Sequence, residues 1–236
     1  MARSVCLLSA CVLAVLGAGC TTTGFSGHPA RQAIDFGPPE AVVLCVYVDD
    51  GISEDFARTL VEEAWRDEAL RYGLTVTVAK VQPWSRPAFR YTGIMEALVR
   101  ERLEAPCDRI LALVGRNVAD FAWNFLPLPE VLGAVDDETL THGYAVARRA
   151  TLNQLFASPA SITRHEIYHL IGCDEHFEME HCYKQISELK QWKHAHESDF
   201  FPAFDAVRKE ILRSREAVNA RLLGRESQAA TSLSSQ

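Results

Sequence analysis

The chain has 236 residues, of which 48% are hydrophobic and 23% charged, and its formal net charge is −7. This composition is ordinary for a globular protein with a sizeable core. An acidic chain without a basic stripe cannot neutralise phosphates, so we expect no nucleic-acid partner. The length favours one domain, and we expect a monomer.

Residues 1–19 are typical of a secretory signal peptide. Arg3 precedes Val5 to Leu16, an uncharged apolar run that is too short for a permanent membrane helix, and small residues follow it. Cys20 then stands where a bacterial lipoprotein carries its lipid, and Thr21 after it resembles the outer-membrane sorting class. We expect a lipid-anchored envelope protein on the periplasmic side of the outer membrane. The alternative is an ordinary cleaved signal and a soluble periplasmic or secreted protein.

The composition also suggests the limits of the folded part. Residues 20–39 are rich in Thr, Gly, Ser and Pro, which predicts a flexible tether. Residues 224–236 are mostly Ser, Gln, Ala and Thr, which predicts a disordered tail. The predicted domain therefore covers residues 40–223.

The first half of this domain alternates apolar runs with amphipathic segments. Strands are predicted at 41–48, 74–81 and 109–114, and helices at 53–71, 94–104 and 118–125. This order predicts a mostly parallel sheet with right-handed crossovers.

The second half begins with two short candidate strands, at 131–135 and 144–147, and one of them is expected to form an exposed sheet edge. A helix is predicted from Ser158 or Ser161 to Gly172. Further amphipathic helices are predicted at 183–195 and 203–223.

Four cysteines lie within the predicted domain: Cys45, Cys107, Cys173 and Cys182. An even number in an oxidising compartment favours disulfides. Of the three possible pairings we favour Cys173 with Cys182, which closes a short loop, and Cys45 with Cys107. The alternative for Cys45, inside an apolar strand, is a buried thiol.

The predicted helix before Gly172 contains His165-Glu166-Ile167-Tyr168-His169. Residues four apart lie on one face of a helix, so His165 and His169 can bind one ion, and neutral imidazole suits zinc. Glu166 can take the proton of a water that attacks a carbonyl carbon, and then pass it to the leaving amine. The simpler alternative is a helix that carries two histidines without function.

The segment His165-Glu166-x-x-His169-x-x-Gly172 resembles the first eight positions of the metzincin signature. The archaemetzincin-like branch, a compact domain with cysteines after the signature, is most similar. The resemblance implies one zincin-like α/β (α+β) domain with a twisted mixed sheet, an active-site helix and a small helical C-terminal part. It also implies that an extended peptide substrate binds at the edge strand, and that the Gly turns the chain towards a third ligand.

The third ligand departs from the signature, which places it at Glu175, whereas the histidine is His176. We predict that His176 binds the metal, because a loop closed by a disulfide can absorb one extra residue. The alternatives are Asp174, Glu175, His181 and, as in the gluzincin class, Glu188. Met179 is the downstream methionine that could form the floor of the site; its alternative is ordinary packing.

These residues predict a hydrolase, a zinc metalloprotease that cleaves a peptide or protein substrate. His165, His169 and His176 would bind Zn²⁺, and Glu166 would be the catalytic residue. The alternatives are a non-catalytic zinc-binding envelope lipoprotein and a zinc amidase acting on cell-wall peptides. Glu166 favours an enzyme, because a binding module does not need it.

Overall fold

The computed structural model describes residues 29–116, 131–148, 157–176 and 178–234. The predicted signal peptide (1–19), Cys20 and the predicted helix at 118–125 lie outside these ranges. Within the described ranges, no helix is both long and apolar enough to cross a membrane.

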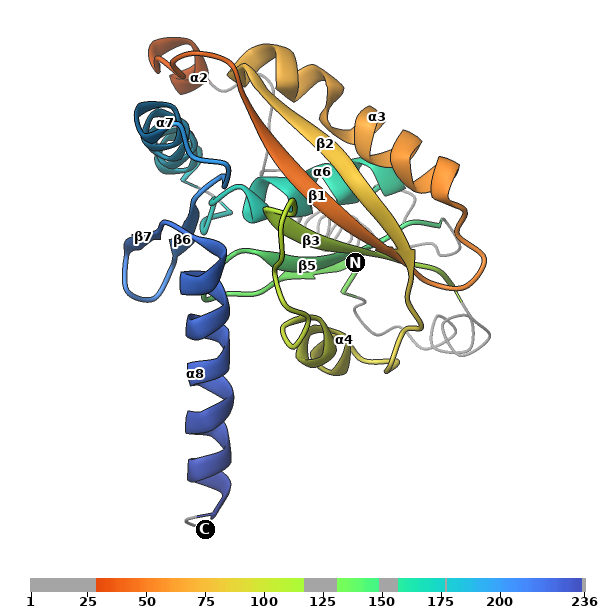
Figure 1. Ribbon diagram of the computed structural model, residues 1–236. Coiled ribbons are helices and arrows are strands. Elements are labelled where there is room, and N and C mark those ends of the chain that lie inside the picture. The colour runs from red at the N-terminus through yellow and green to blue at the C-terminus, as the bar shows by residue number, and fades with distance from the viewer. Residues whose placement is uncertain (1–28, 117–130, 149–156, 177, 235–236) are drawn as a thin grey trace, which may run out of the picture.

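The described residues form a mixed sheet of five strands in the order β2-β1-β3-β5-β4 (Figure 1). The strands are β1 (Glu40–Val48), β2 (Leu74–Pro83), β3 (Arg109–Val114), β4 (Gly133–Val135) and β5 (His142–Val146). β1 pairs parallel with β2 and β3, and β3 pairs parallel with β5, whereas β4 is the antiparallel edge next to β5. The predicted mixed α/β sheet is confirmed, and among the described residues one of the two predicted short strands, β4, stands at an edge of the sheet.

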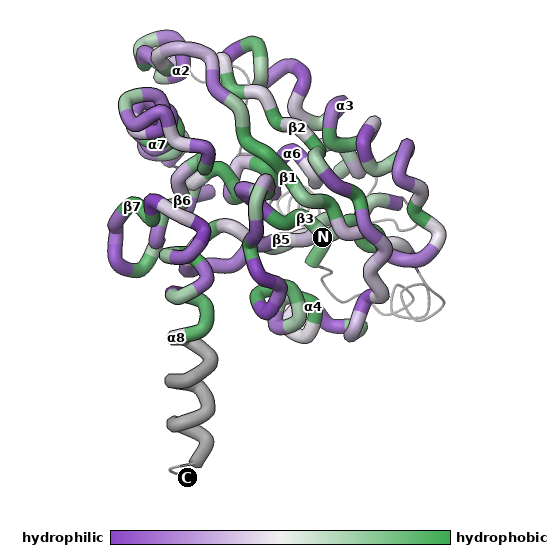
Figure 2. Tube along the Cα trace, viewed as in Figure 1, coloured by the Kyte–Doolittle hydropathy of each residue, from purple (hydrophilic) through white to green (hydrophobic). Residues whose placement is uncertain are grey.

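Helices cover both faces of this sheet (Figure 1). The helices that pack on the sheet include α3 (Glu54–Tyr72), α4 (Tyr91–Leu98), α6 (Pro159–Leu170) and α7 (Met179–His196). Leu44 and Val46 of β1 pack with α3, α6 and α7, whereas Cys45 and Tyr47 pack with α4. After Glu40, β1 is therefore mostly hydrophobic, as Figure 2 shows along the middle of the sheet, because both of its faces are covered.

The predicted helix at 203–223 is wrong over residues 203–214. A hairpin of β6 (Ala203–Asp205) and β7 (Glu210–Leu212) precedes α8 (Arg215–Ser234). The buried carboxylate of Asp205 accepts the backbone N–H groups of Val207 at 3.0 Å and Arg208 at 2.8 Å, and Lys209 adopts a φ of 56°. Local hydrogen bonds of this kind compete with a helix and make a turn instead.

Two predicted boundaries also need correction. The predicted tether (20–39) does not hold for residues 29–39, which contain α2 (Ala30–Ala33) and bury Arg31 and Phe36, each 8% exposed. These two side chains find partners between helices, which composition alone does not reveal. Where the composition predicts a disordered tail, α8 continues to Ser234 and extends away from the sheet (Figure 1).

Candidate metal centre

Helix α6 begins and ends where its sequence indicates. Ser158 is the N-cap, and its hydroxyl accepts the N–H of Ser161 at 3.1 Å, while Pro159 occupies the first turn. At the other end Gly172 has a φ of +114°, which side chains rarely tolerate, and the chain turns away from the helix axis. A helix with these ends carries His165 and His169 on one face.

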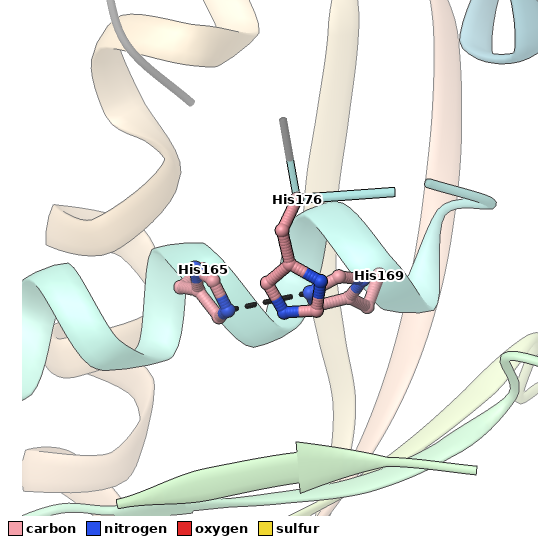
Figure 3. A group of neighbouring side chains, drawn as sticks. All are labelled: His165, His169 and His176. Carbon is pink, nitrogen blue, oxygen red and sulfur yellow. Dashed lines mark hydrogen bonds between the residues drawn. The ribbon is translucent and has the colours of Figure 1, made fainter. Parts of the chain in front are cut away.

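The structure brings three histidines together, and we call His165, His169 and His176 the histidine cluster. One nitrogen from each ring lies within 4.8 Å of the others. His165 Nε2 lies 3.3 Å from His169 Nε2, and the ring centre of His176 lies 4.6 Å from that of His169 and 5.3 Å from that of His165. In Figure 3 His176 reaches from the loop after α6 towards the two helical rings.

The tautomer of His169 follows from its neighbour. Its Nδ1 lies 2.5 Å from the carbonyl oxygen of Cys173, and a carbonyl only accepts, so Nδ1 carries the hydrogen. The lone pair of His169 is then on Nε2, which faces the cluster. Outer hydrogen bonds of this kind orient metal-binding histidines.

Burial keeps the two helical histidines neutral. It lowers the pKa of His165 to about 3, with help from the neighbouring His169 and His176, and the pKa of His169 to about 4. Neutral imidazoles with converging nitrogens are zinc donors, and three of them leave a fourth position open. The cluster therefore fits a zinc ion.

A closed loop brings His176 into this arrangement. Cys173, directly after the turn at Gly172, is bonded to Cys182 of α7, and the predicted pairing is confirmed, as is that of Cys45 with Cys107. The loop therefore spans only nine positions, and it contains the extra residue that separates His176 from the signature spacing.

The other candidate ligands have different surroundings. The Asp174 carboxylate accepts a hydrogen bond from Lys209 Nζ at 2.7 Å and lies 3.6 Å from His181 Nε2. Met179 is 3% exposed and packs in the hydrophobic core. Among the described residues, the grouping of possible metal ligands contains none of the following: Asp174, Glu175, His181 and Glu188.

Glu166 lies between α6 and the edge strand. It is 4% exposed, and burial raises the pKa of its carboxyl to about 8. Its side chain contacts the backbone of Gly133 in β4, because a Cβ at Gly133 would lie 2.3 Å from Glu166 Oε1. A carboxyl with a pKa near neutral is suited to accept and return a proton.

A buried hydrogen-bond chain holds the hairpin that carries Gly133. The Thr139 hydroxyl donates to Asp136 at 2.7 Å and lies 2.7 Å from the Thr141 hydroxyl, which lies 2.8 Å from His142 Nδ1. His142 Nε2 donates to the carbonyl of Glu101 at 2.9 Å, and burial lowers the pKa of His142 to about 4. These buried hydrogen bonds therefore hold the hairpin whose first strand, β4, contacts Glu166.

The sequence did not predict a role for two residues that contact α6 or Glu166. Arg109, fully buried, donates to the carbonyls of Leu170 at the end of α6, of Phe201 at 2.9 Å and of Pro202 at 2.6 Å. Gly133 is the other, since it admits the Glu166 side chain. A charge at the start of an apolar strand was a signal for Arg109, whereas nothing in the sequence marks Gly133.

The fold and the histidine cluster define a mixed α/β protein with a candidate metal centre. No protein-family model matches the chain, and no curated protein matches it. Among solved structures, the chain is similar to an archaemetzincin from Methanopyrus kandleri, with a TM-score of 0.38 and 14% sequence identity over 66% of this chain and 96% of that one. A similarity at this level says nothing about the reaction of this chain.

Proposed function

We propose that this chain is a zinc-dependent hydrolase of peptide bonds. The observation that carries the proposal is the histidine cluster, whose ligand nitrogens lie within 4.8 Å of one another, together with the buried Glu166, which follows His165 on α6. The combination of three imidazoles, an open fourth position and a carboxyl on the same helix as two of them matches catalytic rather than structural zinc sites.

A bound zinc ion supplies Lewis acidity, since it polarises a carbonyl oxygen and lowers the pKa of water. His165, His169 and His176 would hold the ion. Glu166 accepts the proton of the attacking water at its carboxylate and then donates it to the leaving amine. The Glu166 side chain is buried against Gly133, and this burial raises the pKa of its carboxyl to about 8.

The edge strand supports a peptide substrate. Within the described part of the chain, β4 pairs with β5 alone, and its backbone contacts Glu166 at Gly133. An extended peptide can add to such an edge as a further strand, and its amide would then lie beside the histidine cluster. This is the binding mode that the metzincin resemblance implies.

The direct test is cleavage of a mixed peptide library by the zinc-loaded protein, followed by mass spectrometry. We expect one zinc per chain, and we expect Glu166→Gln to lower the rate by about 10²–10⁴-fold while zinc is retained. Glu175→Gln, an exposed carboxylate near the cluster, is the matched control and keeps full activity.

Two results would favour the alternatives. If the wild-type protein binds one zinc and cleaves neither peptides nor cell-wall fragments, the chain is a zinc-binding envelope protein and the hydrolase proposal fails. If it cleaves only cell-wall peptides, it is a zinc amidase.

We further propose that the chain is exported and anchored to the outer membrane through a lipid on Cys20. Both disulfides among the described residues support an oxidising compartment. Labelling of growing bacteria with a fatty-acid analogue tests the anchor, since the label should appear on the wild-type chain and be lost in Cys20→Ala. Label on neither chain would favour a soluble periplasmic or secreted protein.

A further inference from the structure

Tyr168, inside the motif of α6, belongs to a buried polar network that the proposed mechanism does not use. Two residues correspond to about 200° of rotation in an α-helix, so Tyr168 and Glu166 project from nearly opposite sides of α6. Glu166 faces β4, whereas Tyr168 faces α3 and is 0% exposed. A hydroxyl at this depth requires partners.

Its partners come from two other segments. The Tyr168 hydroxyl donates to Glu68 Oε2 of α3 at 2.7 Å and accepts from Arg31 Nη2 at 3.1 Å. Arg31 also forms an ion pair with Glu68, which is 1% exposed. The Tyr72 hydroxyl lies 2.7 Å from that of Tyr168. An ion pair and two phenols therefore meet in the core between α2, α3 and α6.

Arg31 extends this network to α7. Its guanidinium carbon lies 4.8 Å from the ring centre of Tyr72 and 5.6 Å from that of Tyr183. Tyr183 directly follows Cys182, whose disulfide closes the loop of His176. One side chain from the segment before β1 thus contacts the three helices on which the histidine cluster depends.

We propose that Arg31, Glu68 and Tyr168 are positioning residues of the metal centre, and that residues 29–39 lock it in place. This inference rests on the proposed function, because it takes the histidine cluster as a zinc site. Apolar contacts are not directional, whereas hydrogen bonds to a buried ion pair fix the direction of the groups that make them. Fixing the Tyr168 hydroxyl against α3 sets the rotation of α6, and with it the directions of His165, Glu166 and His169.

The rest of segment 29–39 is held to the same helices. The Ser187 hydroxyl of α7 donates to the carbonyl of Asp35 at 2.6 Å. The Phe36 ring packs edge-on against Tyr72, with 4.7 Å between ring centres. Arg31 is therefore delivered by an ordered segment rather than by a free chain end.

The test compares Tyr168→Phe with Tyr72→Phe in the full-length chain. Both substitutions remove one buried phenol hydroxyl, but Tyr72→Phe leaves the bond from Tyr168 to Glu68 intact. Three measurements are made on each variant: zinc affinity by competition with a chromogenic chelator, the visible absorption spectrum of the Co²⁺-substituted protein, and the thermal unfolding midpoint. The cobalt spectrum reports ligand geometry, which a merely structural role would not move.

We expect Tyr168→Phe to weaken zinc binding by about tenfold, which is at the low end of the effect of losing an outer hydrogen-bond partner of a metal ligand. We also expect this variant to have an altered cobalt spectrum. Tyr72→Phe should retain the wild-type spectrum and affinity, with a similar fall in the unfolding midpoint. Arg31→Ala would also leave the buried carboxylate of Glu68 without its ion pair, so this variant should unfold more readily. The conservative substitution Tyr168→Phe is therefore the variant that tests the inference.

The outcomes separate this inference from the proposed function. If the wild-type protein binds zinc and Tyr168→Phe binds it with the same affinity and spectrum, the positioning role is overturned and the proposed function stands. Equal weakening in both variants also overturns it, because the network then acts on stability alone. If the wild-type chain takes up no zinc, both proposals fall.

Discussion

The two halves of the histidine cluster are held in different ways. His165 and His169 lie on α6, and the buried side chains of that helix anchor it to α3 and β4. His176 is exposed and lies in the short segment between α6 and α7, which the disulfide of Cys173 with Cys182 closes.

The difference shows two solutions to the same geometric problem. In the helical half, the helix period places His165 and His169 on one face, and packing in the core fixes the position of the helix. In the loop half, the disulfide of Cys173 with Cys182 closes the segment that carries the exposed His176. The halves should therefore respond differently to substitutions that remove a ring, a hydrogen bond or a covalent link.

The largest expected effect comes from removing one ring from each half. His169→Ala and His176→Ala should each weaken zinc binding by more than the roughly 100-fold that loss of an outer partner can cause. In the metal-free protein the two variants should differ in stability. His169→Ala leaves the carbonyl of Cys173 without its donor and should lower the free energy of unfolding by about 1–3 kcal/mol. His176→Ala should change the free energy of unfolding by less than about 0.5 kcal/mol.

Zinc competition titrations and urea unfolding measure these two quantities. Wild-type zinc affinity in His176→Ala would show that the third ligand is a different residue. Equal stability losses in the metal-free variants would remove the distinction between the two halves.

A smaller effect is expected at the contact between α6 and the edge strand. Gly133→Ala places a Cβ 2.3 Å from Glu166 Oε1, so the carboxylate must move. A displacement of about 1 Å lowers catalytic rates by about 100-fold, whereas zinc affinity should stay within about twofold. Peptide cleavage kinetics and zinc titration test this pair of outcomes.

Gly93→Ala is the matched control. A Cβ at Gly93 would lie 2.5 Å from that of Ala88, which is a similarly tight contact. Gly93 belongs to α4, which packs on the face of the sheet opposite α6 (Figure 1). An equal loss of activity in both variants would point to general destabilisation rather than to displacement of Glu166.

The disulfides allow a sharper test of the loop half. Cys173→Ser with Cys182→Ser should weaken zinc binding by about tenfold, because His176 gains freedom, and should lower the free energy of unfolding by about 3 kcal/mol. Cys45→Ser with Cys107→Ser opens a longer loop, of 62 positions, and should cost about 4 kcal/mol without changing zinc affinity. If the two double variants bind zinc equally well, the loop does not depend on its disulfide.

The smallest effects are expected for the exposed carboxylates near the site. Glu175→Gln and Glu188→Gln remove two alternative ligands that lie outside the cluster. Zinc affinity and the free energy of unfolding should both stay within about 0.5 kcal/mol of wild type. A clear loss of zinc in either variant would identify that carboxylate as the third ligand.

Much of the fold could be predicted because its signals are local. Apolar β-branched runs marked β1 and β3, and Ser158 with Gly172 marked the ends of α6. The hairpin at 203–212 could not be predicted, because the turn depends on hydrogen bonds of the Asp205 carboxylate rather than on periodicity. The order at 29–39 was equally hidden, since Arg31 finds its partner 37 positions away.

The sequence by itself determined the chemistry of the helical half, because residues four apart must share a helix face and two cysteines nine positions apart can close a loop. Only the tertiary structure decided that His176 joins the cluster, that Gly133 contacts Glu166, and that Arg31 reaches Tyr168 across 137 positions. The physical reason is range: backbone periodicity acts within a few residues, whereas contacts between distant segments exist only once the sheet and its helices have packed.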